Sequence, residues 1–393
     1  MPIITTTAEL ADLCRRLRQG NHITIDTEFI RDRTYWPRLC LVQVAGDDEA
    51  RVIDPLADGI DLAPLLALLE DPDVIKVFHA ARQDVEIFYR LTGKVPAPLF
   101  DTQIAAMVCG FGDSVGYDKL VGELAGVRID KASQFTDWAR RPLSERQLRY
   151  ALDDVVHLQV IYAKLVAQLE KSGRSGWLDE EMAILADPET YAVEPENAWR
   201  RLKTRSRNPE YLGVMKELAT WRESEAQRRD LPRNRLLRDE AIYEIAAERP
   251  QRIEDLKRLR AVPKGVAEGP LGEPLLAAVK RGRKLPADQL PQTEAPRQLP
   301  RGIGPLVDLL KVLLKMACEK HGVAQKLIAN VADLERIAAF DDADVAALKG
   351  WRREIFGADA LDLKRGRIAL SAAGKRIKVI RIEPPRRGAE AAD

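Results

Sequence analysis

Residues 22–29 read HITIDTEF, a β-branched run that ends with two carboxylates. Because Ile and Thr are enriched in strands, this run predicts a β-strand over 22–26. Side chains two positions apart on a strand point to the same face, so Asp26 and Glu28 project together near the strand end. A charge beside an apolar run is costly unless a partner such as a metal ion offsets it. Alone, however, an Asp-x-Glu pair is more often two exposed acids at the end of a strand.

The flanking sequence predicts an α/β domain around this strand. Further strands are expected over 39–45, 50–54 and 74–78, and apolar spacings of three and four predict helices over 61–70, 81–91, 101–109, 117–125 and 144–170. Ser144, with Pro142 just upstream and Glu145 after it, is expected to begin the last and longest helix. A cluster of strands followed by helices predicts a mixed sheet covered by helices.

Two more segments carry an acid in a special position. Asp84 follows the strand over 74–78 and is expected in the first turns of the next helix, where alone it would be an ordinary helix-start acid. Tyr150 and Asp154 are four residues apart, so they share one helical face. Alone, this pair would more often be a packed tyrosine beside a solvated acid. The neighbouring Asp153 is an alternative to Asp154, but the Tyr-x-x-x-Asp spacing favours Asp154.

The combination of these acids points to metal-assisted phosphodiester hydrolysis. That reaction needs an activated water, a polarised phosphate and a stabilised leaving oxygen, which a pair of metal ions can supply. Magnesium prefers hard oxygen ligands, with one or two carboxylates for each ion. We therefore predict that two Mg²⁺ ions, for which Mn²⁺ can substitute, are held by Asp26, Glu28, Asp84 and Asp154. Tyr150 completes the catalytic set, and because its phenol titrates near pKa ≈ 10 we assign it to orienting the attacking water.

Several other polar residues lie in or near these segments. His22, His79 and His157 match a magnesium site poorly, since imidazole prefers other metals, and structural roles are expected for them. Asp101 begins a helical pattern and is expected to be a helix cap. Gln43 interrupts an apolar strand and either reaches the substrate or satisfies a buried group.

Composition argues against several classes of protein. The chain has 393 residues, of which 46% are apolar, enough for two or three domains with their own cores. No stretch approaches the roughly 18 consecutive apolar residues of a membrane span. The N-terminus has no basic segment leading into an apolar one, so we expect a cytoplasmic protein without membrane contact. The four cysteines form no Cys-x-x-Cys pair, which fits free thiols in a reducing compartment.

Charge divides the chain into an acidic front and a basic back. Residues 1–195 hold 21 Lys and Arg against 32 Asp and Glu, whereas residues 196–393 hold 41 against 29, which together give a net charge of +1. A basic half attracts a polyanion directly by releasing its counterions. Arginines 228, 229, 233, 235 and 238 could contact phosphates, although a solvated helical face is an equally good interpretation.

Composition and periodicity also predict where the domains begin and end. We expect an α/β domain over 1–195, a linker over 196–209, an all-helical domain over 210–284, a proline-rich linker over 285–302, a second helical domain over 303–383 and a disordered tail over 384–393. The two helical blocks share a faint pattern, which indicates either a diverged repeat or a chance likeness of amphipathic helices.

The motifs resemble those of a known enzyme family. DTEF over 26–29, the later Asp84 and the Tyr150-x-x-x-Asp154 spacing resemble the three exonuclease motifs of the DEDD superfamily, in its tyrosine-bearing subgroup. HAARQD over 79–84 and FDTQ over 100–103 resemble the ribonuclease D family, with His79 where the superfamily often has an upstream Asn. LPRNRLLRDEA over 231–241 resembles the HRDC domain, a small helical nucleic-acid-binding module, and GWRR over 350–353 resembles a second such domain.

The resemblance implies both fold and activity. It implies a ribonuclease H-like α/β nuclease domain followed by two all-α HRDC-like domains. It also implies a 3′-to-5′ exoribonuclease that releases nucleoside 5′-monophosphates from RNA 3′ ends, including those of transfer RNA precursors, and we expect it to act as a monomer. Two alternatives stay open: DNA as the substrate, because the acids contact phosphates rather than sugars, and a nucleic-acid-binding adaptor with a decayed site. The presence of all five motif residues argues against decay.

Overall fold

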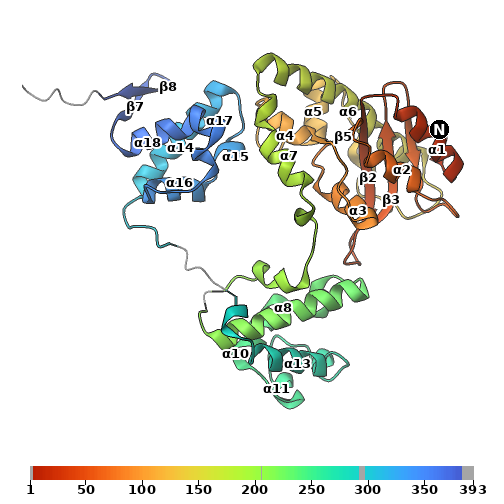
Figure 1. The fold of residues 1–393 in the computed structure, drawn as a ribbon, viewed down its shortest axis with the longest axis vertical. Helices are drawn as coiled ribbons and strands as arrows, with labels where there is room; N and C mark the ends of the chain where they lie inside the picture. Colours follow the sequence, from red (N-terminus) through yellow and green to blue (C-terminus); the bar gives the residue numbers. More distant parts are fainter. Residues whose placement is uncertain (1–2, 205, 292–296, 383–393) are drawn as a thin grey trace, which may run out of the picture.

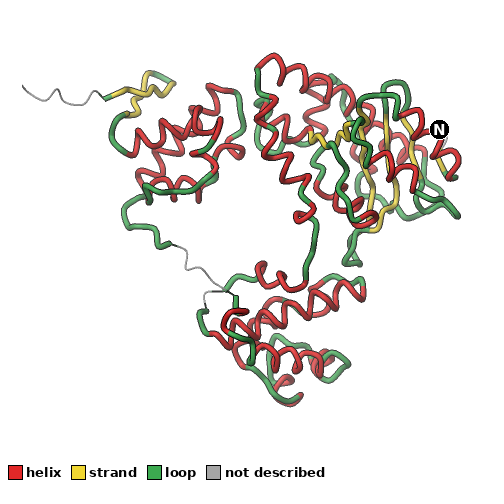
Figure 2. The backbone as a smooth tube through the Cα atoms, in the orientation of Figure 1, coloured by secondary structure: helices red, strands yellow, loops and turns green. Residues whose placement is uncertain are grey.

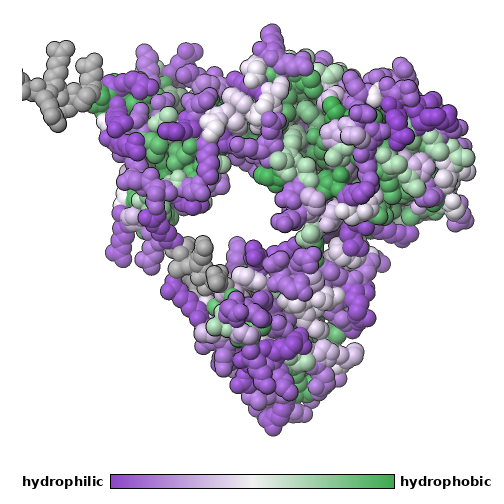
Figure 3. All heavy atoms as spheres, viewed as in Figure 1, coloured by the Kyte–Doolittle hydropathy of each residue, from purple (hydrophilic) through white to green (hydrophobic). Residues whose placement is uncertain are grey.

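The computed structural model describes residues 3–204, 206–291 and 297–382. Figure 1 shows three lobes arranged around an open centre, and Figure 3 shows that the opening remains when side chains are drawn. We call these the nuclease lobe (residues 3–191), the middle lobe (residues 195–291) and the third lobe (residues 303–382). The predicted fold class, a mixed sheet flanked by helices and followed by helical domains, is confirmed.

The nuclease lobe is built on a six-stranded mixed sheet. Its strands, in spatial order, are β1 (Ile3–Ile4), β4 (Ala50–Ile53), β3 (Arg38–Ala45), β2 (His22–Ile30), β5 (Ile75–Phe78) and β6 (Leu99–Asp101). The β2–β3 and β3–β4 pairs are antiparallel, and the other three pairs are parallel. The two short outer strands were not predicted, and β2 continues beyond its predicted end, so that Asp26 and Glu28 lie within the strand.

Helices cover both sides of this sheet. They are α1 (Thr7–Leu17), α2 (Ala63–Leu69), α3 (Arg82–Thr92), α4 (Thr102–Val108), α5 (Tyr117–Leu124), α6 (Glu145–Ser172) and α7 (Asp179–Ala186), with short 3₁₀ turns η1 (Lys131–Ser133), η2 (Ser175–Trp177) and η3 (Pro188–Thr190). The long α6 starts after Ser144 as predicted. Ser144 and Gln147 form a capping box that satisfies exposed N–H groups of the first turn.

Alternation along β2 sends its side chains to two different layers. Ile23 and Ile25 are fully buried in the large core that also contains residues of α1, α2 and α3. Thr24 points the other way, and its hydroxyl donates a hydrogen bond of 2.8 Å to the carbonyl oxygen of Val155 in α6. Because residues two apart share a face, Asp26 also faces α6. This layer order brings the strand acids to the helix that carries Tyr150 and Asp154.

The middle lobe is entirely helical, as predicted. It contains η4 (Pro195–Arg201), α8 (Pro209–Arg229), α9 (Arg233–Leu236), α10 (Asp239–Glu248), α11 (Ile253–Lys257), α12 (Lys264–Ala267), α13 (Gly272–Gly282) and η5 (Ala287–Gln289). Helices α8 and α13 pack so closely at Gly213 that a Cβ atom there would lie 2.2 Å from the carbonyl oxygen of Gly282. The close approach therefore requires glycine at this position. Part of the predicted linker over 196–209 differs: Ala198 and Leu202 are buried in the core of this lobe. We propose that the second domain begins near Pro195.

The third lobe contains helices and, unexpectedly, a β-hairpin. Its elements are α14 (Gly304–His321), α15 (Gln325–Ile328), α16 (Val331–Ala339), η6 (Ala346–Leu348), α17 (Gly350–Arg352), the π-turn η7 (Arg353–Gly357), α18 (Ala358–Lys364), β7 (Ile368–Ala373) and β8 (Arg376–Arg381). The all-helical prediction for 303–383 missed the hairpin, which Figure 2 shows at the end of this lobe. Gly374, with a φ of +62°, permits its two-residue turn. The predicted tail over 384–393 lies outside the described residues.

Apolar side chains join the third lobe to the nuclease lobe in one continuous core. Trp351 stacks on Trp177 with ring centroids 4.2 Å apart and 5° between the planes. Arg352, only 2% exposed, donates to the carbonyl oxygen of Leu327 and forms ion pairs with Glu180 and Glu181 across the junction. None of the described helices is long and apolar enough to cross a membrane.

Candidate active site

The three acids Asp26, Glu28 and Asp154 meet between β2 and α6. Each offers a carboxylate oxygen, and these oxygens all lie within 4.8 Å of one another. Asp26 and Glu28 come from one face of the strand, and Asp154 comes from the helix that crosses that face. The neighbouring Asp153 does not line the cavity that these acids share. The structure therefore brings Asp154 rather than Asp153 to the strand acids.

Asp84 lies in the first turn of α3, as predicted, and reaches the same cavity from another side. It is 7% exposed, and its carboxylate accepts a hydrogen bond from the hydroxyl of Thr27. It is not within the 4.8 Å group that the other three acids form. Thr27 points away from Asp26 and Glu28 along the strand, so it holds Asp84 beside them without competing for their oxygens.

A polar cavity of about 390 Å³ surrounds these acids. Tyr150 lines it one helical turn before Asp154, and its ring packs against Trp138 with centroids 6.0 Å apart. The five predicted catalytic residues thus share one cavity. Other polar residues also line it, and they include Gln83, Gln103, Tyr117, Lys131 and Gln134.

Burial and mutual repulsion make the charged form of these acids unfavourable in the protein alone. Burial, followed by the charges of Asp154 and Asp84, raises the pKa of Glu28 to about 9. Burial also raises the pKa of Asp84 and of Asp154 to about 7, and it raises the pKa of Asp26 well above its ordinary value, with Asp154 adding to the effect. Carboxylates in such a cluster need a compensating cation to remain charged at neutral pH. The donor set is oxygen-only, which suits a hard divalent ion.

Tyr150 is held in its protonated form. Burial, then the charges of Asp154 and Glu28, raise the pKa of its phenol. Its hydroxyl in turn stabilises the charged form of the Asp154 carboxylate. A phenol that keeps its proton can donate a hydrogen bond but cannot act as a base, in agreement with the role predicted for Tyr150.

Asp101 supports the turn that leads into α3. It caps α4, as predicted, by accepting a hydrogen bond of 2.7 Å from the amide of Gln103. Its two carboxylate oxygens also accept from the amides of Ala80 and Ala81, at 3.0 and 2.9 Å. Ala80 adopts a φ of +57°, a conformation that L-residues rarely adopt without such support. Asp101 therefore fixes the start of the helix that presents Asp84.

The predicted structural role accounts for both ring nitrogens of His22 but for only one ring nitrogen of His79. Both ring nitrogens of His22 contact side-chain oxygens, those of Asn21 and Gln159. His79 contacts the hydroxyl of Thr102 through Nδ1, but it lines the cavity, and its Nε2 is buried without a hydrogen-bond partner among the described residues. His157 does not line the cavity.

Tyr117 is a residue of the site that the sequence did not reveal. Its hydroxyl donates hydrogen bonds to the backbone carbonyl oxygens of Asp154 and Asp153, at 2.5 and 3.1 Å. These contacts fix the turn of α6 that carries the helix acid. No local pattern distinguishes Tyr117 from an ordinary residue at a helix start, because its partners lie more than 30 positions away.

Gln43 fits neither interpretation that the sequence left open. It lies directly opposite Asp26 on β3, and its side chain is fully buried. It therefore does not reach the surface of the cavity. Neither its Oε1 nor its Nε2 has a hydrogen-bond partner among the residues that the structure describes.

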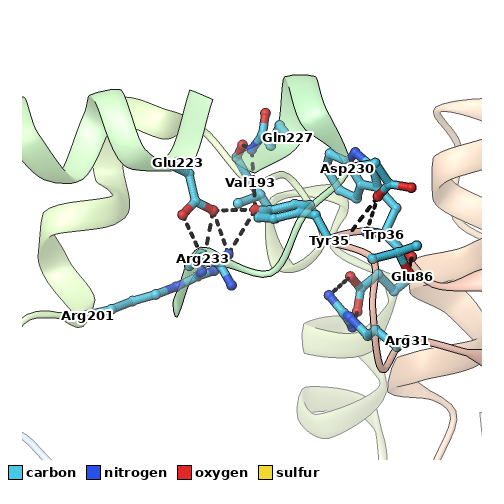
Figure 4. Close-up of polar contacts among 11 residues, drawn as sticks. Arg31, Tyr35, Trp36, Glu86, Val193, Arg201, Glu223, Gln227, Asp230 and Arg233 are labelled. Atoms are coloured by element: carbon cyan, nitrogen blue, oxygen red, sulfur yellow. Dashed lines mark hydrogen bonds and ion pairs between the residues drawn. The ribbon is translucent and has the colours of Figure 1, made fainter. Parts of the chain in front are cut away.

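A polar junction connects the middle lobe to the loop that follows β2 (Figure 4). The hydroxyl of Tyr35 in this loop donates to Glu223 of α8, and the guanidinium of Arg233 binds both oxygens of Glu223 at 2.5 Å. Asp230 accepts from the backbone amides of Tyr35 and Trp36, both at 3.0 Å. Arg233, which the sequence suggested as a phosphate contact, is instead engaged at this junction.

The other arginines suggested as phosphate contacts fall into two groups. Arg228 and Arg229 both form ion pairs with Glu225 on their own helix. Arg235 and Arg238 are exposed, and no ion pair engages them within the described parts of the chain. Only the second pair stays available for an anion without first breaking a contact.

Comparison with known proteins agrees with this geometry. Residues 1–170 match the 3′-5′ exonuclease family, and residues 212–279 match the HRDC domain. The chain is 52% identical over 378 residues to ribonuclease D of Gluconacetobacter diazotrophicus, covering 96% of each protein. It is 53% identical to ribonuclease D of Nitrobacter hamburgensis, covering 98% of this chain and all of the relative. The crystal structure of Escherichia coli RNase D, described as an exoribonuclease involved in structured RNA processing, matches with a TM-score of 0.78 and 34% identity, covering 93% of this chain and 98% of that one.

Proposed function

From the premise that the chain belongs to the ribonuclease D family and is a divalent-metal-dependent 3′-5′ exoribonuclease, we propose how its residues perform the reaction. RNA is hydrolysed from its 3′ end, one nucleoside 5′-monophosphate at a time, at a site that holds two divalent ions. The ligands are the four predicted acids Asp26, Glu28, Asp84 and Asp154. The observation that carries this proposal is the meeting of Asp26, Glu28 and Asp154 oxygens within 4.8 Å.

The acids themselves support a pair of cations. Four carboxylates share one cavity, and burial raises the pKa of each of them; repulsion from Asp154 and Asp84 raises the pKa of Asp26 and Glu28 further. Among these four acids, the oxygens of Asp26, Glu28 and Asp154 form one close group, while Asp84 approaches from α3. This arrangement favours one ion among the close group and a second nearer Asp84. Mg²⁺ suits the all-oxygen donor set, and Mn²⁺ accepts the same ligands.

Each residue of the site has a separate task in this proposal. The bound ions, when present, supply the Lewis acidity that activates water and stabilises the leaving oxygen. Tyr150, kept protonated by its surroundings, orients the attacking water through a hydrogen bond at its hydroxyl. Thr27 and Tyr117 hold Asp84 and the backbone at Asp154 in place. In this proposal no side chain is assigned the role of base.

RNA with structured 3′ regions, including transfer RNA precursors, is the substrate we propose. The family membership and the HRDC domain support an RNA substrate, and the E. coli relative is described as acting in structured RNA processing. We further propose that the protein acts as a monomer in the cytoplasm. A DNA exonuclease remains the second enzyme hypothesis, since carboxylates and metal ions do not distinguish sugars. A decayed, binding-only protein is disfavoured because all five motif residues share the cavity.

Exonuclease assays with catalytic variants test the proposal directly. Purified protein and Mg²⁺ should shorten a 5′-labelled single-stranded RNA from its 3′ end, and a chelator should stop the reaction. Asp26→Asn and Asp154→Asn should each lower the rate by at least about a thousandfold, because a metal ligand is lost. Asp153→Asn is the matched control and should retain most of the activity. Full activity in Asp154→Asn would exclude the assignment, and equal rates on matched RNA and DNA would exclude RNA specificity.

Thermal unfolding gives a test of metal binding that does not depend on activity. Because the pKa of Glu28 is raised in the folded state, its contribution to stability is present below its unfolded value of about 4.3 and is lost as pH rises toward about 9. With a chelator, the protein should therefore become less stable over this range. Mg²⁺ should restore a few °C of Tm, more at pH 8 than at pH 6. Glu28→Gln should flatten the pH dependence, and an unchanged slope would contradict the cluster's role.

A further inference from the structure

A dense group of cations lies at the outer end of the third lobe. Residues 364–382 contain seven basic residues and no acidic residue, and these basic residues are Lys364, Arg365, Arg367, Lys375, Arg376, Lys378 and Arg381. Most of this segment forms the β7–β8 hairpin. Figure 1 shows the hairpin on the side of the third lobe away from the nuclease lobe. Since the whole chain has a net charge of only +1, this concentration of positive charge is local.

One face of the hairpin is turned toward the lobe. Leu370 and Val379 are paired directly across the two strands, and both pack against the hydrophobic core. Ile368 on the same face is 2% exposed. Because side chains alternate along a strand, the residues next to these point away from the lobe. The hairpin therefore has a fixed inner face and a free outer face.

The outer face combines long cations with small neighbours. Arg376 and Lys378 on β8 are exposed, and the strand register pairs them with Ala373 and Ser371 on β7. Small side chains on β7 leave a flat surface beside the cations. Two cations on alternate residues of a strand are about 6.6 Å apart along it. Such a surface lets a chain of phosphates approach and contact both charges at once.

The charges on this outer face are not neutralised by neighbouring acids. Lys364 forms an ion pair with Asp341, and Arg367 and Arg381 approach the acids of α18 at 3.5 to 3.8 Å. Arg376 and Lys378 have no ion pair within the described ranges 3–204, 206–291 and 297–382. They are therefore available to replace the counterions of a polyanion, which favours binding through the entropy of counterion release.

We propose that the outer face of the β7–β8 hairpin binds the phosphate backbone of the RNA substrate at a distance from the active site. This inference rests on the proposed function, because it assigns a second contact to the same RNA. Phosphate contacts position a nucleic acid without reading its sequence. The hairpin thus adds affinity for any RNA whose body extends to the third lobe, and it leaves hydrolysis at the 3′ end to the nuclease lobe.

The cations of the hairpin could instead protect an open strand edge, and this alternative gives a different experimental outcome. Both strands of a two-stranded sheet have an open edge, and lysine on an exposed edge prevents pairing with other chains. If this protection were their only role, removing the charges would promote association of the protein and leave RNA affinity unchanged. If the hairpin binds RNA, the effect must depend on RNA length, because the hairpin lies on the side of the third lobe away from the nuclease lobe and a short oligonucleotide in the active-site cavity should not reach it.

The test compares two RNAs on the full-length protein. The variant Arg376→Ala/Lys378→Ala removes two exposed cations and no core side chain, so it should fold normally. Binding of a stem-loop RNA with a single-stranded 3′ overhang, measured by fluorescence anisotropy with a chelator present, should weaken about tenfold at ~0.1 M salt. The slope of log affinity against log salt should fall by about 1.5 to 2. Binding and hydrolysis of a single strand of about five nucleotides should not change.

Control variants separate this proposal from its alternatives. Lys315→Ala/Lys320→Ala removes the same charge from exposed positions on α14 and should have little effect on the stem-loop RNA. Arg376→Lys/Lys378→Arg keeps the charge and should restore wild-type binding. Equal affinity of wild type and the alanine variant for the stem-loop RNA would overturn the hairpin site, as would an equal loss on both RNAs. Absence of 3′ shortening of the short RNA by the wild type would instead overturn the proposed function.

Discussion

The nuclease lobe contacts its two neighbours through junctions of opposite character. The third lobe joins it through a continuous apolar core, with stacked Trp177 and Trp351 and a buried Arg352. The middle lobe joins it at a loop, through a small apolar cluster and the polar network of Tyr35, Glu223 and Arg233. Apolar burial is non-directional and resists separation, whereas a polar network can exchange its partners for water. The difference indicates that the third lobe is a fixed part of the nuclease and the middle lobe a separable one.

The location of the polar junction connects it to the active site. The loop that holds Tyr35 continues directly from β2, which carries Asp26 and Glu28. The loop is also held by its own lobe, because Arg31 forms an ion pair with Glu86 at 2.8 Å. The middle lobe therefore docks on a loop that continues directly from the strand of the proposed metal site. Release of the middle lobe would change this loop first.

Removing Arg352 should have the largest effect, because it weakens the junction between the third lobe and the nuclease lobe. Arg352→Ala leaves the carbonyl oxygen of Leu327 without its donor and removes two ion pairs across the lobes. We expect unfolding free energy to fall by about 3 kcal/mol, since one partner of a buried network is lost. Urea denaturation measures this change. Arg353→Ala, at an exposed neighbouring position, should cost less than about 0.5 kcal/mol. Similar values for both variants would mean that the buried guanidinium does not hold the lobes.

A smaller change at Tyr35 should sharpen the contrast by acting on the other junction alone. Tyr35→Phe removes the hydroxyl that donates to the buried Glu223 and should weaken the junction by about 1.5 kcal/mol. Small-angle scattering should show a more extended particle, while denaturation of the nuclease lobe stays unchanged. The double variant with Glu223→Gln should lose less than the sum of the two single losses, because the residues interact. Additive losses would contradict a direct coupling.

Acidification should give the smallest effect of the three changes. It should weaken the junction of the middle lobe, which depends on the charged Glu223, before the apolar junction of the third lobe. Burial raises the pKa of Glu223, but hydrogen bonds from Arg233 and Tyr35 lower it by more. The charge of Arg201 adds a weaker lowering, so the pKa of Glu223 lies below its ordinary value. A lowered folded pKa contributes stability above the unfolded value of about 4.3 that is lost as pH falls through the folded pKa. Below about pH 4 the middle lobe should therefore loosen before the third lobe. Scattering between pH 7 and pH 3.5 checks this order. Glu223→Gln should abolish the dependence, and simultaneous release of both lobes would contradict it.

Much of the fold and of the candidate site could be predicted because the signals are local. The β-branched run over 22–26 predicted the strand, and the apolar spacing of three and four over 144–170 predicted the helix. The mixed sheet and the ribonuclease D resemblance are confirmed. The short β1 and β6 were missed because two or three residues give no periodicity. The β7–β8 hairpin was missed because its signal is weak, a glycine between two runs in which small and basic residues dilute the β-branched ones.

Local pattern was sufficient to name Asp26, Glu28, Asp84, Tyr150 and Asp154 and to place each on its element, because one strand or one helical turn determines which side chains share a face. Their catalytic roles stay predictions until they are tested. The Tyr-x-x-x-Asp spacing favoured Asp154 over Asp153, and the folded chain brings Asp154 to the strand acids. Only the folded chain decided that Arg233 binds Glu223 rather than a phosphate. It also decided that cations at 376 and 378 face outward together. These outcomes depend on contacts between segments far apart in sequence, and no local pattern records which distant side chain a charged residue will meet in the tertiary structure.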